Sequence, residues 1–205
     1  MMSLSGGTGD YDGLYINGAQ LEMYVSHSSS ETGAVGSSLV VGNWYHLAIV
    51  REGFTSLKVY LNGALDITNL DNVTTRVAVA QNDIDQRSGV TGEAFNGRVC
   101  AVKAWSTSLT LAEVNSEMNT IRPINQASLH AFWPMFPGSG ERIKDYSGNG
   151  RDWTEVGTLT DEDPAPVSYG GSSILVSAAA GGGGGSPAPT IPNFRVPINP
   201  VIMGF

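Results

Sequence analysis

The sequence of 205 residues is poor in cysteine and in charged side chains. Its single cysteine, Cys100, has no partner for a disulfide within the chain, which excludes a fold stapled by disulfides. Cys100 lies in an apolar stretch, which predicts a buried thiol rather than a reactive one. Charged residues make up 15% of the chain, yet no run of about 20 apolar residues occurs, so we expect no transmembrane helix and no membrane partner.

Basic residues are also few: 11 stand against 19 acidic ones, and the net charge is −8. A nucleic-acid surface needs clustered Lys and Arg to neutralise phosphates, so we expect no nucleic-acid partner. Residues 1–10 have neither a basic residue nor an apolar core, and we therefore expect no secretory signal and folding in a reducing cytoplasm.

Patterns that carry catalysis are missing as well. His27, His46 and His130 are far apart, without the spacing of metal ligands. No Gly-x-Ser-x-Gly elbow of a serine hydrolase occurs, and the glycine run 181–185 has no lysine of a phosphate loop. The residues thus give no indication of metal, triad or phosphate-loop chemistry.

The chain does contain many glycines and short apolar segments typical of strands. Residues 44–50 are apolar on both parities, which predicts a strand buried on both faces in the middle of a sandwich. Residues 57–62 alternate, with Leu57, Val59 and Leu61 on the buried face and Tyr60 on the half-exposed one. Asn62-Gly63 and Asn17-Gly18 predict tight hairpin turns.

Local sequence patterns predict one helix and several further strands and loops. Thr110 and Glu113 form a capping box, which predicts a helix from Leu111 to about Met118. Lys103 shares the apolar parity of the strand expected at 95–105, which we interpret as a frayed or bulged end. Further strands are expected at 13–16, 21–25, 74–80, 129–133 and 153–159, with loops at 26–36 and 81–92 and a loose or partner-ordered start at 1–9.

Two blocks of this sequence resemble a known family. Trp44-Tyr45-His46-Leu47-Ala48 with 57–63, and 95–105 with 109–114, look like the concanavalin A-like, laminin-G-like jelly-roll domains. The resemblance implies an all-β, concanavalin A-like jelly-roll sandwich of two antiparallel sheets with one short helix. That fold serves lectins, glycanases, adhesion modules and viral structural proteins, so it does not fix a function by itself.

The order of one motif departs from the family. In many relatives an Asp-x-Ser-Gly-Asn-Gly turn precedes the central hairpin, whereas here it lies at 145–150, after the helix. Either the C-terminal strands complete the sandwich in a permuted order, or a neighbouring copy supplies them. We favour completion within the chain.

The resemblance also makes two carbohydrate functions worth considering, glycan hydrolysis and sugar binding. Glycanases of the family carry their carboxylates as Glu-x-Asp-x-x-Glu on one strand, and no such motif occurs, so we expect no enzyme and no catalytic residue. Sugar binding would use exposed aromatic rings, and its candidates are Tyr24, Tyr60 and Trp153.

Calcium is bound by many relatives, and Asp145, Asn149 and Asp152 offer oxygen ligands within eight residues. The same residues make a good turn without a metal. We therefore expect no cofactor and no metal site, with calcium as the less favoured alternative.

The chain divides into three parts. We expect the sandwich at 1–168, a linker rich in Gly, Ala and Pro at 169–190, and an apolar C-terminal arm at 191–205. Prolines exclude a regular helix in the arm, while its large apolar side chains need burial, so we expect it to bind another subunit; folding back on its own domain is the alternative. The predicted partner-binding residues are Ile191, Phe194, Arg195, Val196, Ile198, Val201, Ile202, Met203 and Phe205.

An acidic, lectin-like sandwich with an anchoring arm resembles, in architecture, the accessory proteins of bacteriophage virions. This implies a structural virion protein, a capsid decoration or cement protein or a head-fibre or tail subunit, that binds other virion proteins such as the major capsid protein through its arm. We expect a homo-oligomer, a trimer first, located in the virion and assembled in the host cytoplasm. The alternative is a lectin-like carbohydrate-binding module for surface or host recognition.

Overall fold

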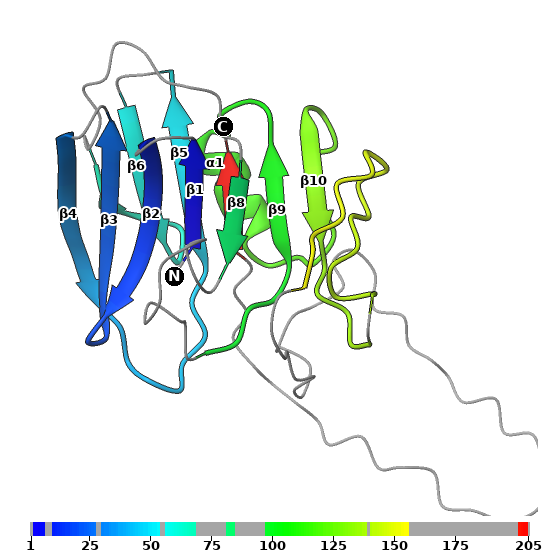
Figure 1. The fold of residues 1–205 in the computed structure, drawn as a ribbon, viewed down its shortest axis with the longest axis horizontal. Coiled ribbons are helices and arrows are strands. Elements are labelled where there is room, and N and C mark those ends of the chain that lie inside the picture. The colour runs from blue at the N-terminus through cyan, green and yellow to red at the C-terminus, as the bar shows by residue number, and fades with distance from the viewer. Residues whose placement is uncertain are drawn as a thin grey trace, which may run out of the picture.

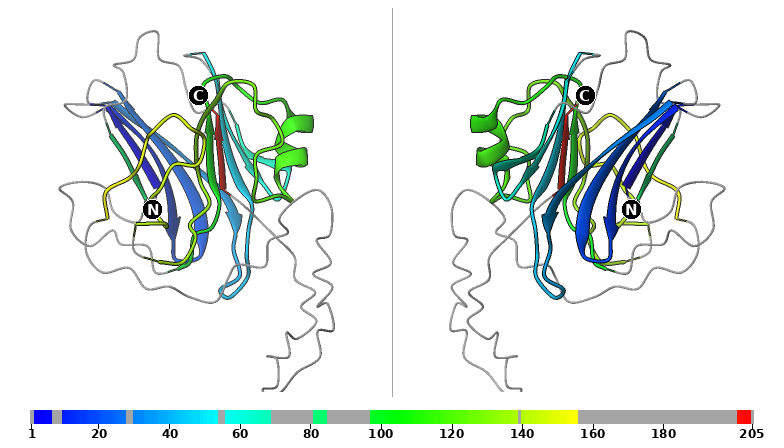
Figure 2. Two further views of the ribbon diagram at one scale, coloured as in Figure 1. Left: turned by 90° about the vertical axis from the view of Figure 1, so that its right-hand side faces the viewer. Right: turned by 90° about the vertical axis from the view of Figure 1, so that its left-hand side faces the viewer.

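The structure is a computed structural model that describes residues 2–6, 10–27, 30–53, 56–68, 81–84, 97–138, 140–155 and 201–204. Its strands form two sheets that pack face to face, and helix α1 (Leu111–Glu117) lies on the outer side of one of them (Figures 1 and 2). The expected all-β sandwich with one short helix is confirmed.

Sheet A has the strand order β4-β3-β2-β1-β8, and its neighbours are antiparallel. The predicted hairpin is present, but the residues with positive φ are Gly18 and Ala19, one position later than expected. The strands are β1 (Met2–Gly6), β2 (Asp10–Asn17), β3 (Gln20–His27), β4 (Ser30–Ser38) and β8 (Gln81–Ile84).

Sheet B has the order β10-β9-β11-β5-β6-β7. Asn62 and Gly63 both have positive φ, which confirms the second predicted turn. Strand β11 is parallel to both of its neighbours, whereas the other pairs are antiparallel. The strands are β5 (Leu47–Glu52), β6 (Ser56–Leu61), β7 (Ala64–Ile67), β9 (Val102–Trp105), β10 (Leu129–Trp133) and β11 (Val201–Gly204).

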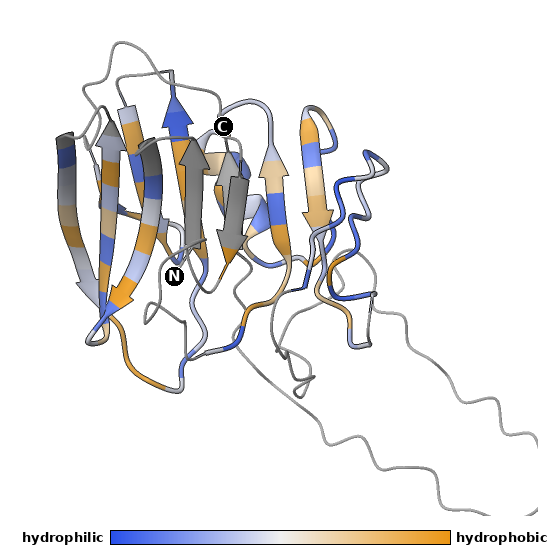
Figure 3. Cartoon of the chain, in the orientation of Figure 1, coloured by the Kyte–Doolittle hydropathy of each residue, from blue (hydrophilic) through white to orange (hydrophobic). Residues whose placement is uncertain are grey.

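The main core lies between the two sheets. Hydrophobic and hydrophilic residues alternate along β3 and the second half of β2 (Figure 3), so one face of sheet A turns inward. Sheet A contributes Leu14, Leu21, Met23 and Val25, which pack against residues of sheet B such as Ile49 and Trp133. Close to one end of this core, Arg51 of β5 donates a 2.6 Å hydrogen bond from Nη2 to the buried Asp12 carboxylate of β2, which ties the two sheets together.

A second apolar layer lies on the other face of sheet B, under α1. Residues Leu47 to Val50 of β5 are all buried, as predicted for a strand covered on both faces. Tyr60 belongs to this second layer together with Trp105 and Val114. Its prediction as a half-exposed residue is wrong, because α1 covers the face that solvent would otherwise reach.

Helix α1 begins as the sequence predicts. The Thr110 hydroxyl accepts a hydrogen bond from the Glu113 backbone N–H, and the Glu113 carboxylate accepts one from the Thr110 N–H at 2.7 Å. Leu109 and Val114 pack in the same cluster, which completes the expected hydrophobic staple. This local geometry sets the helix on the outside of sheet B.

Parts of three segments predicted as loops or as a loose start are strands. Most residues of β1, β4 and β8 are polar or glycine, but their backbones pair in sheet A. In β4, Gly33 and Val35 point away from the core and Ala34 toward it, so an outer strand needs few apolar residues. Tertiary pairing here overrides local composition.

Other predicted segments differ or are not covered. Of the strand expected at 95–105, the structure describes residues 97–105, and within them Val102–Trp105 is a strand; the described residues 153–155 are not one. Residues 74–80, 156–200 and 205 lie outside the described residues, and with them the predicted linker and most of the arm. Strands β10 and β11 both join sheet B, so residues after the helix complete the sandwich within the chain.

Candidate functional site

The outer face of sheet A carries a pair of tyrosines. Tyr24 of β3 points away from the core, because its neighbours Met23 and Val25 point inward. Its partners in register are Gly13 on β2 and Gly33 on β4, so it is flanked by residues without side chains. A Cβ atom on Gly33 would lie 2.5 Å from Cε1 of Tyr24, which shows that the ring lies across the glycine backbone.

The second ring belongs to Tyr15 of β2. It covers Gly13 as closely as Tyr24 covers Gly33, and a Cβ atom on Gly13 would clash with it. The two ring centroids are 5.4 Å apart and the rings are nearly perpendicular, at 88°. Both side chains are half-buried, so part of each ring faces solvent.

Glu22 places a carboxylate beside these rings. Its Oε2 accepts a 3.1 Å hydrogen bond from the Tyr24 hydroxyl, and its Oε1 accepts a 3.3 Å bond from the Asn17 side-chain amide. This hydrogen bond, together with the Glu22 charge, raises the pKa of Tyr24. We call Tyr15, Glu22, Tyr24 and the two glycines beneath them the tyrosine platform; it offers aromatic faces next to a hydrogen-bond acceptor.

The three predicted glycan-binding residues are not brought together. Tyr24 is on the platform, but Tyr60 is only 7% exposed in the layer under α1, which leaves no ring face for a sugar. Trp153 stacks on Trp133 with centroids 4.2 Å apart and an angle of 23°, and it packs against the core. The sequence analysis missed Tyr15 and Glu22, although both share the outward parity of Tyr24 in the paired strands.

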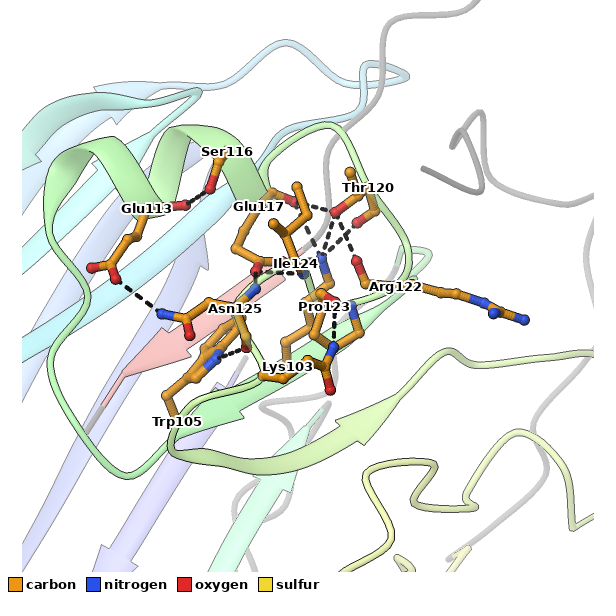
Figure 4. Close-up of polar contacts among 11 residues, drawn as sticks. Lys103, Trp105, Glu113, Ser116, Glu117, Thr120, Arg122, Pro123, Ile124 and Asn125 are labelled. Atoms are coloured by element: carbon orange, nitrogen blue, oxygen red, sulfur yellow. Dashed lines mark hydrogen bonds and ion pairs between the residues drawn. The ribbon is translucent and has the colours of Figure 1, made fainter. Parts of the chain in front are cut away.

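A buried ion pair fixes α1 to sheet B (Figure 4). The Lys103 ammonium of β9 lies 2.8 Å from Oε2 of Glu117, and both side chains are fully buried. Lys103 also donates to the Thr120 carbonyl at 2.7 Å, while Oε1 of Glu117 accepts hydrogen bonds from the backbone N–H groups of Ile124 and Asn125. Burial lowers the pKa of Lys103, and the Glu117 carboxylate opposes that shift.

This arrangement corrects the interpretation of Lys103 as part of a frayed or bulged end. The buried ammonium group of Lys103 is stabilised because it forms an ion pair with Glu117 and donates hydrogen bonds to two oxygens of Thr120. The observed shift of register is on the partner strand, between Leu129 and Ala131. With its hydrogen bonds used within the fold, the ion pair has the character of a structural contact rather than a reactive one.

Two further buried groups lie near this lysine. Burial lowers the pKa of His46 to about 3, and the Lys103 charge adds to that effect. Burial raises the pKa of Cys100 to about 11, so its thiol is protonated at neutral pH. The predicted burial of Cys100 is confirmed.

The turn at 145–150 stabilises the end of β10. Asp145 accepts hydrogen bonds from the N–H groups of Phe132, Ser147 and Arg151 at 2.8–3.0 Å, and from the Ser147 hydroxyl at 2.9 Å. These contacts lower the pKa of Asp145 against the opposing effect of burial. Asn149 donates to the His130 carbonyl at 2.9 Å, at the shift of register in β10.

The side chains considered as calcium ligands are engaged in hydrogen bonds within this turn. Both carboxylate oxygens of Asp145 already accept hydrogen bonds, and Asn149 turns its amide nitrogen to backbone carbonyls. Asp152 accepts a bond from the Asp145 N–H at 2.8 Å. Across the described ranges, no group of three or more His, Cys, Asp or Glu residues is arranged to hold a metal.

The predicted partner-binding residues fall into two sets. Val201, Ile202 and Met203 belong to β11, in the chain's own sheet, which is the arrangement considered as the alternative in the sequence analysis. Outside the described residues lie Ile191, Phe194, Arg195, Val196, Ile198 and Phe205.

Comparison with known proteins identifies one family that matches this chain. A sequence model described as the concanavalin A-like lectin/glucanases superfamily, of laminin-G type, matches residues 1–115. No curated protein and no solved structure matches the chain. In the part of the chain that the structure describes, no helix combines the length and apolarity needed to cross a bilayer.

Proposed function

This chain belongs to the concanavalin A-like lectin/glucanases superfamily, and from that premise we propose that its sandwich is a lectin-like carbohydrate-binding domain. The observation that carries the proposal is the tyrosine platform, where the Tyr24 ring lies over Gly33 beside the Glu22 carboxylate. The ligand class is a neutral sugar with an apolar C–H face and free hydroxyl groups.

The chemistry of the platform suits such a ligand. Aromatic faces carry partial negative charge and pack against C–H groups, so a sugar ring would lie on Tyr24 or Tyr15. Sugar hydroxyls would donate to Glu22, and hydrogen bonds to a charged acceptor are stronger than neutral ones. Because Gly13 and Gly33 have no side chains, the rings lie low on the sheet and a ligand can approach them from solvent.

We propose binding without turnover. Glycoside hydrolysis needs an acid and a second carboxylate placed on opposite sides of the scissile bond. The sequence lacks the Glu-x-Asp-x-x-Glu pattern that supplies them in family glycanases. Glu22 is held by the Tyr24 hydroxyl and the Asn17 amide, which suits a fixed acceptor.

The test is a glycan array followed by calorimetry on the full chain. We expect the Tyr24→Ala variant to bind the selected oligosaccharide at least about tenfold more weakly, since the stacking surface is lost, and Tyr24→Phe to retain most of the affinity. Tyr146→Ala is the matched control, because Tyr146 is 40% exposed on the turn after β10. Unchanged binding by Tyr24→Ala would place the sugar elsewhere.

A second candidate is a structural role in a bacteriophage virion, as a decoration, cement, head-fibre or tail accessory subunit. It is supported by the composition of the C-terminal segment, in which large apolar side chains alternate with prolines from Ile191 to Phe205 and Arg195 is the one charged residue. In this role the arm would contact other virion proteins such as the major capsid protein, and the oligomer would be located in the virion after assembly in the host cytoplasm.

Co-sedimentation with particles from the source lysate tests this role. A chain carrying Phe194→Ser and Ile198→Ser keeps β11 intact and should lose at least about tenfold in particle affinity, because both side chains would be buried at the contact. The control carries Val40→Ser and Val41→Ser, two apolar residues that are 64% and 90% exposed on the sandwich itself. Equal pelleting of both variants would argue against attachment through the arm.

A further inference from the structure

Strand β11 occupies a slot in the middle of sheet B. It pairs with β5 from Val201↔Leu47 to Gly204↔Val50, and with β9 from Val201↔Val102 to Gly204↔Trp105. In the described sheet order, β11 lies between β9 and β5 and is the neighbour of each strand on the side that faces the other. Without β11 the sheet would divide into β10-β9 and β5-β6-β7, with the two edges about 9–10 Å apart.

The slot is buried along its whole length. Every residue of β5 and β9 that is in register with β11 is buried: Leu47, Ala48, Ile49, Val50, Val102, Lys103, Ala104 and Trp105. Sheet A covers one face and α1 lies on the other (Figure 2). Open strand edges in such a position have backbone N–H and C=O groups that neither solvent nor the chain satisfies, so an occupant is required.

Strand β11, which fills the slot, is distant in sequence from the two strands with which it pairs. Residues 156–200 separate β11 from Glu155, and 45 residues span up to about 150 Å when extended. Strand β11 is therefore not joined to its slot by a short turn, and in the unfolded chain the entropic cost of closing a connection grows with its length. A second copy of the chain presents the same strand with identical contacts.

We propose that the β5–β9 slot is an intermolecular acceptor site, filled by β11 of a second copy when copies are concentrated. The second copy is the occupant that fits, because the register of β11 matches the slot residue by residue and that segment is present in every copy. The inference concerns copies of this chain alone. It therefore stands apart from both proposed functions.

Cysteine pairs in register test the exchange. Met203 and Ile49 are direct partners, and neighbouring strands place such Cα atoms within the range that a disulfide can bridge. One full-length chain carries Met203→Cys and a second, differently tagged chain carries Ile49→Cys, both with Cys100→Ala. The two chains are unfolded together, refolded at about 1 mM and oxidised.

We expect a disulfide-linked pair of different chains, at least tenfold more abundant than with the control partner Val35→Cys, which lies exposed on sheet A. A single chain that carries both cysteines gives the reference for closure within one copy. The proposal is overturned if that chain closes on itself while the mixed chains link no more than the control.

Light scattering on the unmodified chain measures its oligomeric state and gives a second test, which does not depend on whether the cysteine variants fold. Refolding at about 1 mM should give a larger oligomeric fraction than refolding at about 1 μM. Ile202→Pro, which removes a backbone donor from β11, should abolish this oligomer. A monomer at both concentrations, or an oligomer that persists in Ile202→Pro, overturns the proposal.

Discussion

At the scale of single residues, His46 and Lys103 are two buried ionisable side chains that the fold accommodates in different charge states. Both side chains are fully buried. Lys103 has its charge matched by Glu117, whereas neither ring nitrogen of His46 has a hydrogen-bond partner among the described residues. The lysine is accommodated as an ion, but the histidine is stable only as the neutral imidazole.

This difference predicts a pH dependence of stability. Burial lowers the pKa of His46 from 6.5 to about 3, so between these values the unfolded chain binds a proton that the folded chain does not. The stabilisation is complete above about pH 6.5 and is lost as the pH falls toward 3. We expect the free energy of unfolding to decrease by about 1 kcal/mol per pH unit below pH 6.

Urea denaturation between pH 7 and pH 5 measures this slope. In His46→Leu the slope should be smaller by about 1 kcal/mol per pH unit, since the titrating ring is gone. His130→Gln is the control, because burial also lowers the pKa of His130, which is however only partly buried. Equal slopes in wild type and His46→Leu would show that His46 binds its proton as readily in the folded chain as in the unfolded one.

At the scale of elements, helix α1 is short and depends on its attachments. Seven residues are too few for a helix that is stable by itself, so its position follows from the capping box, the apolar layer beneath it and the buried ion pair. The Lys103–Glu117 contact also orders the loop after the helix, through the N–H groups of Ile124 and Asn125.

Removing one partner of this ion pair should loosen the whole helical layer. We expect Lys103→Met to cost about 3–5 kcal/mol of stability, because the Glu117 carboxylate is then buried without a counter-charge. The double variant Lys103→Met, Glu117→Gln should recover part of this loss, since glutamine keeps an oxygen for the backbone N–H groups. Guanidinium denaturation of the single and double variants measures both effects.

Lys58→Met provides the comparison. Lys58 forms a 2.8 Å ion pair with Glu52 on the exposed side of the hairpin β5–β6, and solvent replaces such a contact easily. Its removal should leave the denaturation midpoint almost unchanged. A similar loss in Lys58→Met and Lys103→Met would contradict a special role for the buried pair.

At the scale of the whole molecule, local signals in the sequence predicted the elements that local physics controls. The turn at Asn62-Gly63, the doubly buried strand β5 and the capping box of α1 are all in place. The all-β family and its sandwich also followed from the residues around the central hairpin. These features depend on neighbours a few residues apart.

What the sequence did not predict depends on distant partners. Most residues of strands β1, β4 and β8 are polar or glycine, and their strand character arises from pairing in sheet A. The platform combines Tyr15 and Tyr24 across two strands, and their closeness follows from a register that no single segment encodes. The parallel placement of β11 follows in the same way from contacts with β5 and β9.

The position of β11 also bears on the biosynthesis of the protein. A ribosome that adds about 5–20 residues per second needs about two to nine seconds to pass from Glu155 to Val201. During that interval every other described strand has been translated, while the centre of sheet B still lacks its last member. During this interval the edges of β5 and β9 that face β11 are unpaired, and unpaired strand edges are sites at which β-structure aggregates.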